Sequence, residues 1–379
     1  MVSCNLLKDQ KCSRCLMDTS AENIHFYDNG FCNYCTDYQN KHKHLSKKNT
    51  LEELLTAIKA KRKNNQYDCI VGLSGGIDSC YALFKAVEVG LKPLAVHMDN
   101  GWNSELAQNN ISNLVNYLNV DLYTYVIDWE EYRNMQEAFL KANVVDVELL
   151  YDNAMMAVNY KIASKFKTKY ILSGMNINSE GFNIPKNWSW HKNDARNISQ
   201  IVKKFSNQKI NTFPLFGTFS YIKYEIIKKI KWISFLDFIE YEKKKAIEEL
   251  SLKTNFKKYP YKHYENIFTR FYQGYILPEK FGIDKRKMHL SNLIMSNQIS
   301  REEGLREIQK LPYLNAEELE KDKRYFLKKM NWDKKKLENY ILQKKVDHSV
   351  YGSEKSMWIL FSRIYKLFLI LKKIITLPR

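Results

Sequence analysis

The stretch Ser74-Gly75-Gly76-Ile77-Asp78-Ser79 decides how this chain folds. It follows an apolar run at residues 68–73, which is typical of a buried strand, and it precedes a helix predicted over residues 79–88. Two adjacent glycines let the backbone approach an anion closely. The two serine hydroxyls and the first amides of the helix can then donate hydrogen bonds to the same oxygens. The stretch therefore predicts a phosphate-binding loop.

Neither of two widespread nucleotide-binding motifs accounts for this loop. The chain lacks the spacing G-x-x-x-x-G-K-[S/T], and no G-x-G-x-x-G follows its first predicted strand. By itself, Ser-Gly-Gly is equally compatible with an ordinary turn. The interpretation as a phosphate site therefore depends on the strand before the loop and the helix after it.

Strand-like and helix-like segments alternate through residues 50–240. Strands are expected at residues 68–73, 93–98, 121–127, 169–173 and, with a weaker pattern, 210–215. Helices are expected at residues 51–62, 79–88, 105–118, 130–142 and 151–166. This alternation predicts an α/β fold with a parallel, doubly wound sheet. Ligands of such sheets bind beyond the carboxyl ends of the strands.

Two further polar loops are expected at the same edge of the sheet. Residues 97–102, His-Met-Asp-Asn-Gly-Trp, follow one predicted strand. Residues 173–181, Ser-Gly-Met-Asn-Ile-Asn-Ser-Glu-Gly, follow another. Each loop alone is compatible with a simple turn. Three polar, glycine-containing loops at one edge of one sheet predict a shared binding site.

The cysteines form a second strong pattern. All seven lie within the first 80 residues, and four make two Cys-x-x-Cys pairs, Cys12 with Cys15 and Cys32 with Cys35, with sixteen residues between the pairs. Two knuckles at this spacing bring four thiolates to one metal ion, which predicts a zinc ribbon with a closed structural site. Disulfides and an iron–sulfur cluster are the alternatives. A cytoplasmic chain favours metal over disulfides.

The composition is typical of a soluble globular protein. The 379 residues are 45% hydrophobic, enough for about two or three domains. The polar N-terminal segment does not resemble a secretory signal, and Lys and Arg interrupt every apolar run before about 20 residues accumulate. We therefore expect a cytoplasmic protein that is not integral to a membrane. The net charge of +18 would suit polyphosphate, anionic lipid or nucleic acid, but a general compositional bias explains it more simply.

Three regions follow from these patterns. We expect the ribbon and a connector at residues 1–48, the α/β domain at 49–240 and a mainly helical region at 241–379. The helical region includes a segment rich in aromatic and cationic side chains, residues 262–275, and an apolar tail with interspersed Lys and Arg, residues 358–375. We expect the tail to pack as a helix, and attachment to a membrane surface is the alternative.

Together the motifs resemble known proteins at two levels. The loop at residues 74–79 is similar to the pyrophosphate loop (PP-loop) of the N-type ATP pyrophosphatases, which split ATP into AMP and pyrophosphate. The combination resembles the N-acetyl sugar amidotransferases of bacterial surface-polysaccharide and flagellar sialic-acid-like sugar pathways, the WbpG and PseA group. The resemblance is carried by the four ribbon cysteines and by residues 74–79, 96–102, 171–181 and 263–278.

The resemblance implies a reaction as well as a PP-loop fold. Members of this group are thought to convert a sugar acetamido group to an acetamidino group, in lipopolysaccharide or pseudaminic acid biosynthesis and flagellin glycosylation. An amide carbonyl is a poor electrophile and its oxygen is a poor leaving group. Adenylation of that oxygen by ATP and Mg²⁺, followed by displacement of AMP by ammonia, overcomes both obstacles.

The expected roles are assigned residue by residue. The catalytic residues are expected to be Ser74, Asp78, Asn176 and Glu180. The ATP contacts are expected to be Ser74, Gly75, Gly76, Asp78, Ser79, Asp99, Asn100 and Gly174, with Asp78 also a partner of Mg²⁺. The contacts with the substrate are expected to be Asn178, Lys262, His263 and Arg270. The structural Zn²⁺ is assigned to Cys12, Cys15, Cys32 and Cys35.

The ammonia is expected to come from another protein. Met1-Val2-Ser3 excludes a glutaminase that begins with its catalytic cysteine, and no cysteine follows Cys80 to serve as the nucleophile of the triad type. The resemblance suggests a separate glutaminase and an ammonia-conducting subunit, similar to the two subunits of imidazole-glycerol-phosphate synthase. The substrate partner is an acetamido sugar, free or nucleotide-linked.

Two other functions remain open from the sequence. A PP-loop enzyme that thiolates tRNA would fit the loop, the positive charge and the ribbon. Such enzymes usually need a cysteine near the α/β site, and only Cys69 and Cys80 are close to the loop in sequence. A non-catalytic zinc-containing nucleic-acid-binding protein would not require a phosphate loop. We therefore expect no nucleic-acid partner.

Overall fold

A five-stranded parallel sheet forms the centre of the α/β domain in the computed structural model, which describes residues 10–45, 50–61 and 65–375. The strands are β1 (Cys69–Gly72), β2 (Pro93–Asp99), β3 (Leu122–Val126), β4 (Tyr170–Ser173) and β5 (Lys231–Ser234). Their order in the sheet is β3-β2-β1-β4-β5, and every neighbouring pair is parallel. The predicted α/β class and parallel sheet are confirmed.

The alternation of side chains along β1 creates two separate cores. Cys69 and Val71 face a core formed with α2 (Leu51–Ala60), α3 (Ile77–Glu88), α4 (Glu105–Leu118) and α10 (Lys243–Thr254). Ile70, between them, faces a core formed with α5 (Trp129–Lys141), α6 (Leu149–Lys165) and α8 (Ala195–Phe205). Because successive side chains of a strand point to opposite faces, an entirely apolar strand needs helices on both.

The strand order reverses between β1 and β4, which places their following loops together. The chain passes from β1 outward to β2 and β3, and then returns to β4 on the other side of β1. Such a switch point leaves a crevice beyond the carboxyl ends of the two strands. The phosphate loop follows β1 and the loop at residues 173–181 follows β4, so both reach this crevice.

The prediction of a strand at residues 210–215 is wrong. The backbone amides of Asn211 and Thr212 donate to the carboxylate of Glu131, and Phe216 exchanges backbone hydrogen bonds with the side chain of Asn153. The segment is thus held by side chains and has no neighbouring strand. The fifth strand is β5, which pairs with β4 from Tyr170↔Lys231 to Ser173↔Ser234.

Helices account for most of the remaining chain. They are α1 (Asn33–Leu45), α7 (Ile177–Glu180), α9 (Thr218–Tyr221), α11 (Ile267–Phe271, continued by π-type turns through Phe281), α12 (Arg286–Met295), α13 (Arg301–Gln309), α14 (Ala316–Met330), α15 (Lys334–Leu342) and α16 (Lys355–Ile375). Ser300 and Glu303 form a capping box at the start of α13. Among the described residues, no helix combines the length and apolar character needed to span a bilayer.

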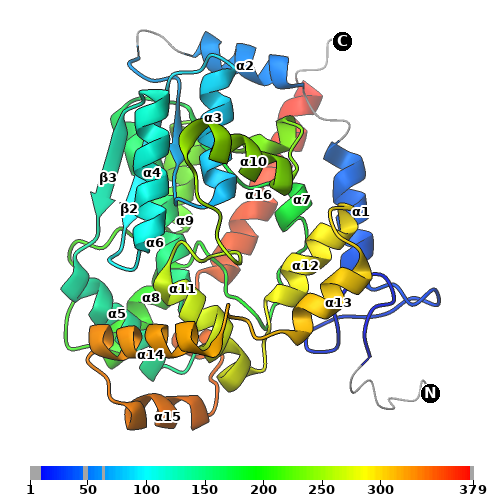
Figure 1. The fold of residues 1–379 in the computed structure, drawn as a ribbon. Coiled ribbons are helices and arrows are strands. Elements are labelled where there is room, and N and C mark those ends of the chain that lie inside the picture. Colours follow the sequence, from blue (N-terminus) through cyan, green and yellow to red (C-terminus); the bar gives the residue numbers. More distant parts are fainter. Residues whose placement is uncertain (1–9, 46–49, 62–64, 376–379) are drawn as a thin grey trace.

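The C-terminal region lies against the carboxyl edge of the sheet. Figure 1 shows the arrowhead of β3 pointing toward the part of the molecule that contains α14 and α15. The amide of Ser104, after β2, donates to the carbonyl of Glu265 at 2.9 Å, and the amide of Ile267 donates to the carbonyl of Trp102 at 2.8 Å. These two bonds fasten residues 265–267 to the loop that follows β2.

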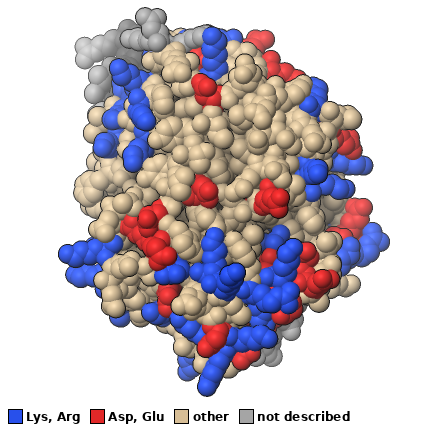
Figure 2. Space-filling model, turned by 60° about the vertical axis from the view of Figure 1, so that its left-hand side comes forward, with Lys and Arg blue, Asp and Glu red and all other residues tan. Residues whose placement is uncertain are grey.

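Charged side chains of both signs are mixed on the surface. On the face drawn in Figure 2, Lys and Arg are interspersed with Asp and Glu, and apolar and neutral residues separate the groups. This face therefore carries no continuous basic stripe of the kind that follows a nucleic-acid backbone.

Candidate active site

The phosphate loop has the geometry of an anion cradle. The Ser79 hydroxyl oxygen lies 3.0 Å from that of Ser74 and 3.1 Å from the Ser74 amide, and the Gly76 amide donates to the Ser74 hydroxyl at 3.2 Å. Gly76 precedes α3 and contributes no side-chain cap, so the first amides of α3 face the loop. Gly75 has φ +85°, and a Cβ there would lie 2.8 Å from the Ala107 carbonyl oxygen. Glycine is therefore required at this position.

Gly174 brings the loop after β4 against the start of α3. A Cβ on Gly174 would lie 2.4 Å from the backbone carbonyl carbon of Asp78 and 2.6 Å from the Ser79 amide nitrogen. Real Cβ atoms do not approach backbone this closely. Gly174 therefore allows two loops, separated by about half of the α/β domain in sequence, to meet beside the phosphate cradle.

We expect Gly174→Ala to shift the start of α3 and so misplace Asp78. The unfolding free energy should fall by about 1–3 kcal/mol through overpacking, and AMP formation should fall roughly 100-fold because small misplacements of reacting groups are costly. Thermal unfolding and an AMP assay measure the two effects. Gly90→Ala is the control, because a Cβ there meets nothing within 4 Å and only its positive φ adds a cost. Unchanged AMP formation in Gly174→Ala would contradict this packing argument.

Asp78 is held by a tyrosine from outside the predicted loops. The Tyr241 hydroxyl donates a short hydrogen bond to the Asp78 carboxylate. Burial and the negative charge of Asp78 raise the pKa of Tyr241 far above its usual value, so the hydroxyl remains a donor. The side-chain amide of Asn178 in turn donates to the Tyr241 carbonyl at 3.2 Å. The orientation of Asp78 thus depends on contacts between β4–α7 and the segment before α10.

Glu265 places a second carboxylate over the phosphate loop. One of its oxygens lies 3.3 Å from where a Cβ on Gly76 would be, and the same oxygen lies 3.6 Å from His263 Nδ1. Burial opposes ionisation, but His263 and Lys262 outweigh it and hold the pKa of Glu265 below its usual value. Sequence reasoning assigned this residue no role. Its signals were its place in the segment 262–275 and in residues 263–278, which carry the family resemblance.

Glu180 and Lys262 form an ion pair at the same edge. Their nitrogen–oxygen distance is 2.7 Å, and the side chains retain 33% and 17% exposure. Burial disfavours the charged carboxylate, but Lys262 overcomes this and lowers the pKa of Glu180. Burial would lower the pKa of Lys262, but the negative charges of Glu180, Asp78 and Glu265 outweigh it and raise that pKa. Glu180, Lys262, Asp78 and Glu265 therefore share one electrostatic environment.

His289 of α12 adds an uncharged polar group beside these residues. Its ring centroid lies 5.3 Å from that of His263, and neither ring nitrogen has a hydrogen-bond partner among the described residues. Burial is the largest cause that lowers its pKa well below the usual value, and Lys262, His263, Lys285 and Lys243 add to it. Neutral His289 therefore leaves both ring nitrogens available for a ligand.

Three predicted site residues have their side chains engaged in shaping the loops. The Asn176 carboxamide accepts from the Ser179 amide at 2.8 Å and donates to the Gly174 carbonyl at 3.1 Å. The Asp99 carboxylate accepts from the Gly101 amide at 2.8 Å. The buried Asn100 side chain accepts from the Trp102 amide at 3.1 Å. Direct contact of these side chains with a ligand stays a prediction.

Arg270, a predicted substrate contact, is already paired with other side chains of the protein. Its guanidinium makes two 2.5 Å hydrogen bonds to the Asp322 carboxylate and lies 4.8 Å from the centre of the Tyr264 ring. These contacts join α11 to α14. A role for Arg270 in substrate binding stays a prediction.

The four ribbon cysteines converge as expected for one metal ion. The measured sulfur–sulfur distances are 3.7 Å for Cys15–Cys32 and Cys32–Cys35 and 3.8 Å for Cys12–Cys35. A tetrahedron with metal–sulfur bonds of about 2.3 Å has edges of about 3.8 Å. Backbone amides donate to the sulfurs, including Cys32 to Cys12 at 3.3 Å and Met17 to Cys15 at 3.4 Å. The donor set and spacing fit a tetrahedral metal ion such as Zn²⁺.

The ribbon braces the elements that line the candidate site. Asp18 forms an ion pair with Lys287 of α12 at 2.5 Å, and the Leu16 amide donates to the Ser291 hydroxyl at 3.0 Å. Arg301 of α13 donates to the Cys12 carbonyl at 3.0 Å. Lys41 donates to the Gly181 carbonyl at 2.8 Å, just after the loop that contains Glu180. The cysteine cluster is therefore connected to both α12 and the loop after β4.

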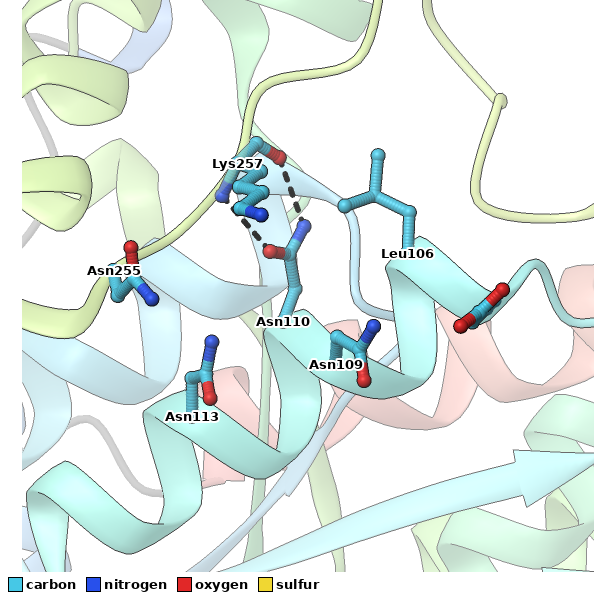
Figure 3. A pocket seen from close by; sticks show the side chains of 7 residues that line it. Leu106, Asn109, Asn110, Asn113, Asn255 and Lys257 are labelled. Carbon is cyan, nitrogen blue, oxygen red and sulfur yellow. Dashed lines mark hydrogen bonds between the residues drawn. The ribbon is translucent and has the colours of Figure 1, made fainter.

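A separate pocket of about 300 Å³ lies on the outer side of α4. Its lining includes Asn109, Asn113 and Asn255, and Figure 3 shows these side chains around Asn110, which bonds the Lys257 backbone at 2.9 and 3.0 Å. None of the phosphate-loop residues lines this pocket. We therefore assign it no part in the candidate active site.

Comparisons with known families agree with this arrangement. Residues 64–179 match the family model described as thiamine biosynthesis protein (ThiI). Residues 265–365 match the model described as the C-terminal domain of LPS biosynthesis protein WbpG-like. No curated protein matches the chain significantly.

Several solved structures show weak overall similarity. NH3-dependent NAD synthetase from Campylobacter jejuni is 17% identical over 70% of this chain and 96% of its own, with a TM-score of 0.32. NMN synthetase from Francisella tularensis is 17% identical over 56% of this chain and 97% of its own, with a TM-score of 0.28. A 4-thiouridine synthetase in complex with RNA and ATP is 19% identical over 45% and 41%, with a TM-score of 0.25. Scores this low support no further argument.

This chain has a PP-loop-like α/β domain: its match to the ThiI model covers the phosphate loop and strands β1 to β4. It carries a WbpG-like C-terminal domain, which supplies Glu265 to the site, and the resemblance found in the sequence is thereby confirmed.

Proposed function

We propose that this chain is an ATP-dependent amidotransferase that converts an acetamido group of a sugar into an acetamidino group. One observation carries the proposal: the WbpG-like domain places Glu265 directly over a PP-loop cradle. A phosphate loop alone would be compatible with many reactions. Its assembly with a WbpG-like domain supports the reaction type that the resemblance suggests. We place this reaction in bacterial surface-glycan or nonulosonate biosynthesis in the cytoplasm.

The proposed reaction begins with adenylation. The acetamido oxygen attacks the α-phosphorus of ATP, the bond from that phosphorus to the pyrophosphate oxygen breaks, and an O-adenylated imidate forms. Ser74, Ser79 and the first amides of α3 donate to the departing pyrophosphate, where negative charge accumulates. These groups are held by hydrogen bonds within the loop, so little reorganisation is needed.

The second half of the reaction consumes ammonia. Ammonia adds to the imidate carbon, the bond to the adenylate oxygen breaks, AMP leaves and a proton is released. Glu180, Lys262 and His289 are the polar groups beside the phosphate loop that we assign to positioning the sugar and ammonia. Asp78 and Glu265 would hold Mg²⁺, which prefers carboxylate oxygens and would neutralise charge on the pyrophosphate.

Thiolation of tRNA is the second candidate, because the ThiI model matches residues 64–179. Every cysteine that the structure describes is buried, and Cys69 and Cys80 have no exposed surface. Burial is the main cause that raises the pKa of both thiols, so neither is a reactive thiolate. This observation favours the amidotransferase. RNA that co-purifies and binds with strong salt dependence would favour thiolation instead.

The decisive experiment supplies acetamido sugars with ATP, Mg²⁺ and a nitrogen source. With high ammonium, the purified chain should release AMP and pyrophosphate and yield a product lighter by the difference between an oxygen atom and an NH group. With glutamine it should be inactive, because the described residues include no exposed cysteine that could serve as a glutaminase nucleophile. Mass spectrometry and nucleotide chromatography measure both outcomes.

The partner is part of the same proposal. Adding a glutaminase and its ammonia-conducting subunit should restore glutamine use, while the ammonium reaction should not need them. Detection of ADP and phosphate as the only nucleotide products would contradict the adenylation step. Efficient use of glutamine by the rigorously purified chain would contradict the proposed separate glutaminase.

A further inference from the structure

The long helix α16 has one face that packs on the protein. Trp358 and Phe361 contact Tyr221, with ring centroids 4.8 and 6.1 Å away, and Trp358 also lies 5.5 Å from the ring of His191. Figure 1 draws the helix in red. These aromatic contacts orient α16 and decide which of its side chains face outward.

The opposite face of α16 exposes large apolar side chains. The exposed fractions are 44% for Ile359, 60% for Leu360, 57% for Ile364 and 61% for Leu367. Residues three and four positions apart lie on the same side of a helix, so Leu360, Ile364 and Leu367 form one stripe, which Ile359 adjoins. Isolated apolar residues are common on surfaces, but a contiguous stripe indicates a site of interaction.

The charge of this segment has a single sign. Residues 355–379 contain six Lys or Arg and no Asp or Glu. Arg363 and Lys366 are both exposed, and Arg363 lies one turn from Ile359 and one turn from Leu367. The apolar stripe is therefore interspersed with cations and lacks any acidic group within its own helix.

The neighbouring surface has the same character. The segment that contains Tyr221 also carries Phe219 and Ile227, which are 73% and 71% exposed. Lys223 and Lys229 in this segment are exposed as well. Both elements of this corner of the molecule thus combine exposed apolar side chains with positive charge.

We propose that α16 attaches the protein to the surface of an anionic lipid bilayer. An amphipathic helix with cations beside an apolar stripe lies in the plane of the interface, with its apolar side chains at the boundary between headgroups and acyl chains. Arg363 and Lys366 would extend along the apolar surface to reach lipid phosphates. The absence of acidic residues from 355 to 379 matches the negative surface charge of such a membrane.

The geometry places the helix on the membrane and not through it. Cations in the middle of the helix are costly in hydrocarbon, and Trp358 and Phe361 hold the other face to the protein. The proposal is independent of which reaction the site catalyses.

Vesicle sedimentation tests this proposal with the full chain. Vesicles of phosphatidylcholine mixed with phosphatidylglycerol should pellet the protein, whereas phosphatidylcholine alone should not, and added salt should weaken binding. Arg363→Gln combined with Lys366→Gln should weaken apparent affinity about thirtyfold, given roughly 1 kcal/mol for each cation near an anionic surface. Leu360→Glu combined with Ile364→Glu should weaken it at least as much.

Matched controls separate the stripe from general surface hydrophobicity. Leu252→Glu on α10 and Leu342→Glu on α15 make the same chemical change at side chains that are 88% and 82% exposed. These variants should bind vesicles like the wild type. Circular dichroism and ammonium-dependent activity without lipid should be unchanged in all variants, because none of the changed residues lies in the phosphate-loop site.

Three outcomes would overturn the proposal. One is absence of binding to anionic vesicles, and another is equal binding to both lipid compositions. The third is wild-type affinity of the Leu360→Glu/Ile364→Glu variant. The main alternative is that the stripe joins two copies of this chain, and light scattering tests it. In that case the wild type would be a dimer that does not bind lipid, and the Leu360→Glu/Ile364→Glu variant would be a monomer.

Discussion

Combined replacement of Ser74 and Ser79 by alanine is expected to reduce AMP formation at least about 1,000-fold, because loss of one oxyanion donor already costs roughly 100- to 1,000-fold. The two hydroxyls bond each other at 3.0 Å, and each also bonds a loop amide. Their removal therefore eliminates two donors to pyrophosphate and loosens the loop that presents the backbone amides. The loss of AMP formation should be equal with ammonium and with a glutaminase partner, since both routes require adenylation.

The measurement is the rate of AMP release with saturating ammonium, accompanied by thermal unfolding. Ser199→Ala is a matched control, because that hydroxyl bonds only the Ala195 carbonyl within its own helix. The control should retain near-wild-type activity. A double variant that folds normally and still forms AMP at the wild-type rate would show that the loop is not the adenylation site.

Replacement of all four ribbon cysteines by serine is expected to remove about one zinc ion per chain and to destabilise the protein by several kcal/mol. The rate of AMP formation should fall as well. The ribbon contacts Lys287 and Ser291 of α12, and Lys41 bonds the loop after β4. His289 and Glu180 belong to these two elements, so their positions depend on the ribbon.

Elemental analysis and chemical unfolding measure these two effects. Cys69→Ala is the control: it changes a fully buried thiol outside the ribbon and should lower stability while leaving the metal content intact. A quadruple variant with full zinc content would disprove the assignment. In the wild type, iron in place of zinc would support the iron–sulfur alternative. Ribbon thiols of the wild type that react with a thiol reagent only after reduction would support disulfides.

Local sequence patterns were sufficient for the elements that depend on short-range physics. Short apolar segments that alternate with longer helix-like segments identified β1, β2, β3 and β4 and the helices between them. The glycines at positions 75 and 76 marked the phosphate loop because a close approach of backbone demands them. The spacing of Cys12, Cys15, Cys32 and Cys35 predicted the convergence that the structure shows.

The strand that was predicted at residues 210–215 shows where such patterns fail. Residues 210–215 have strand-like composition, yet Glu131 and Asn153 take up their backbone groups, and β5 forms at Lys231–Ser234 instead. Strand formation requires a free neighbouring edge as well as apolar residues. Only the tertiary structure determines which segment reaches that edge.

The sequence by itself determined the fold class, the phosphate loop and the cysteine cluster, because each is encoded by residues close together along the chain. The tertiary structure decided that Glu265 lies over Gly76, that Tyr241 holds Asp78 and that α16 exposes its apolar stripe. These features join residues far apart in sequence or depend on which face of a helix is covered. Local propensity contains no information about such contacts, which arise from packing of the whole chain.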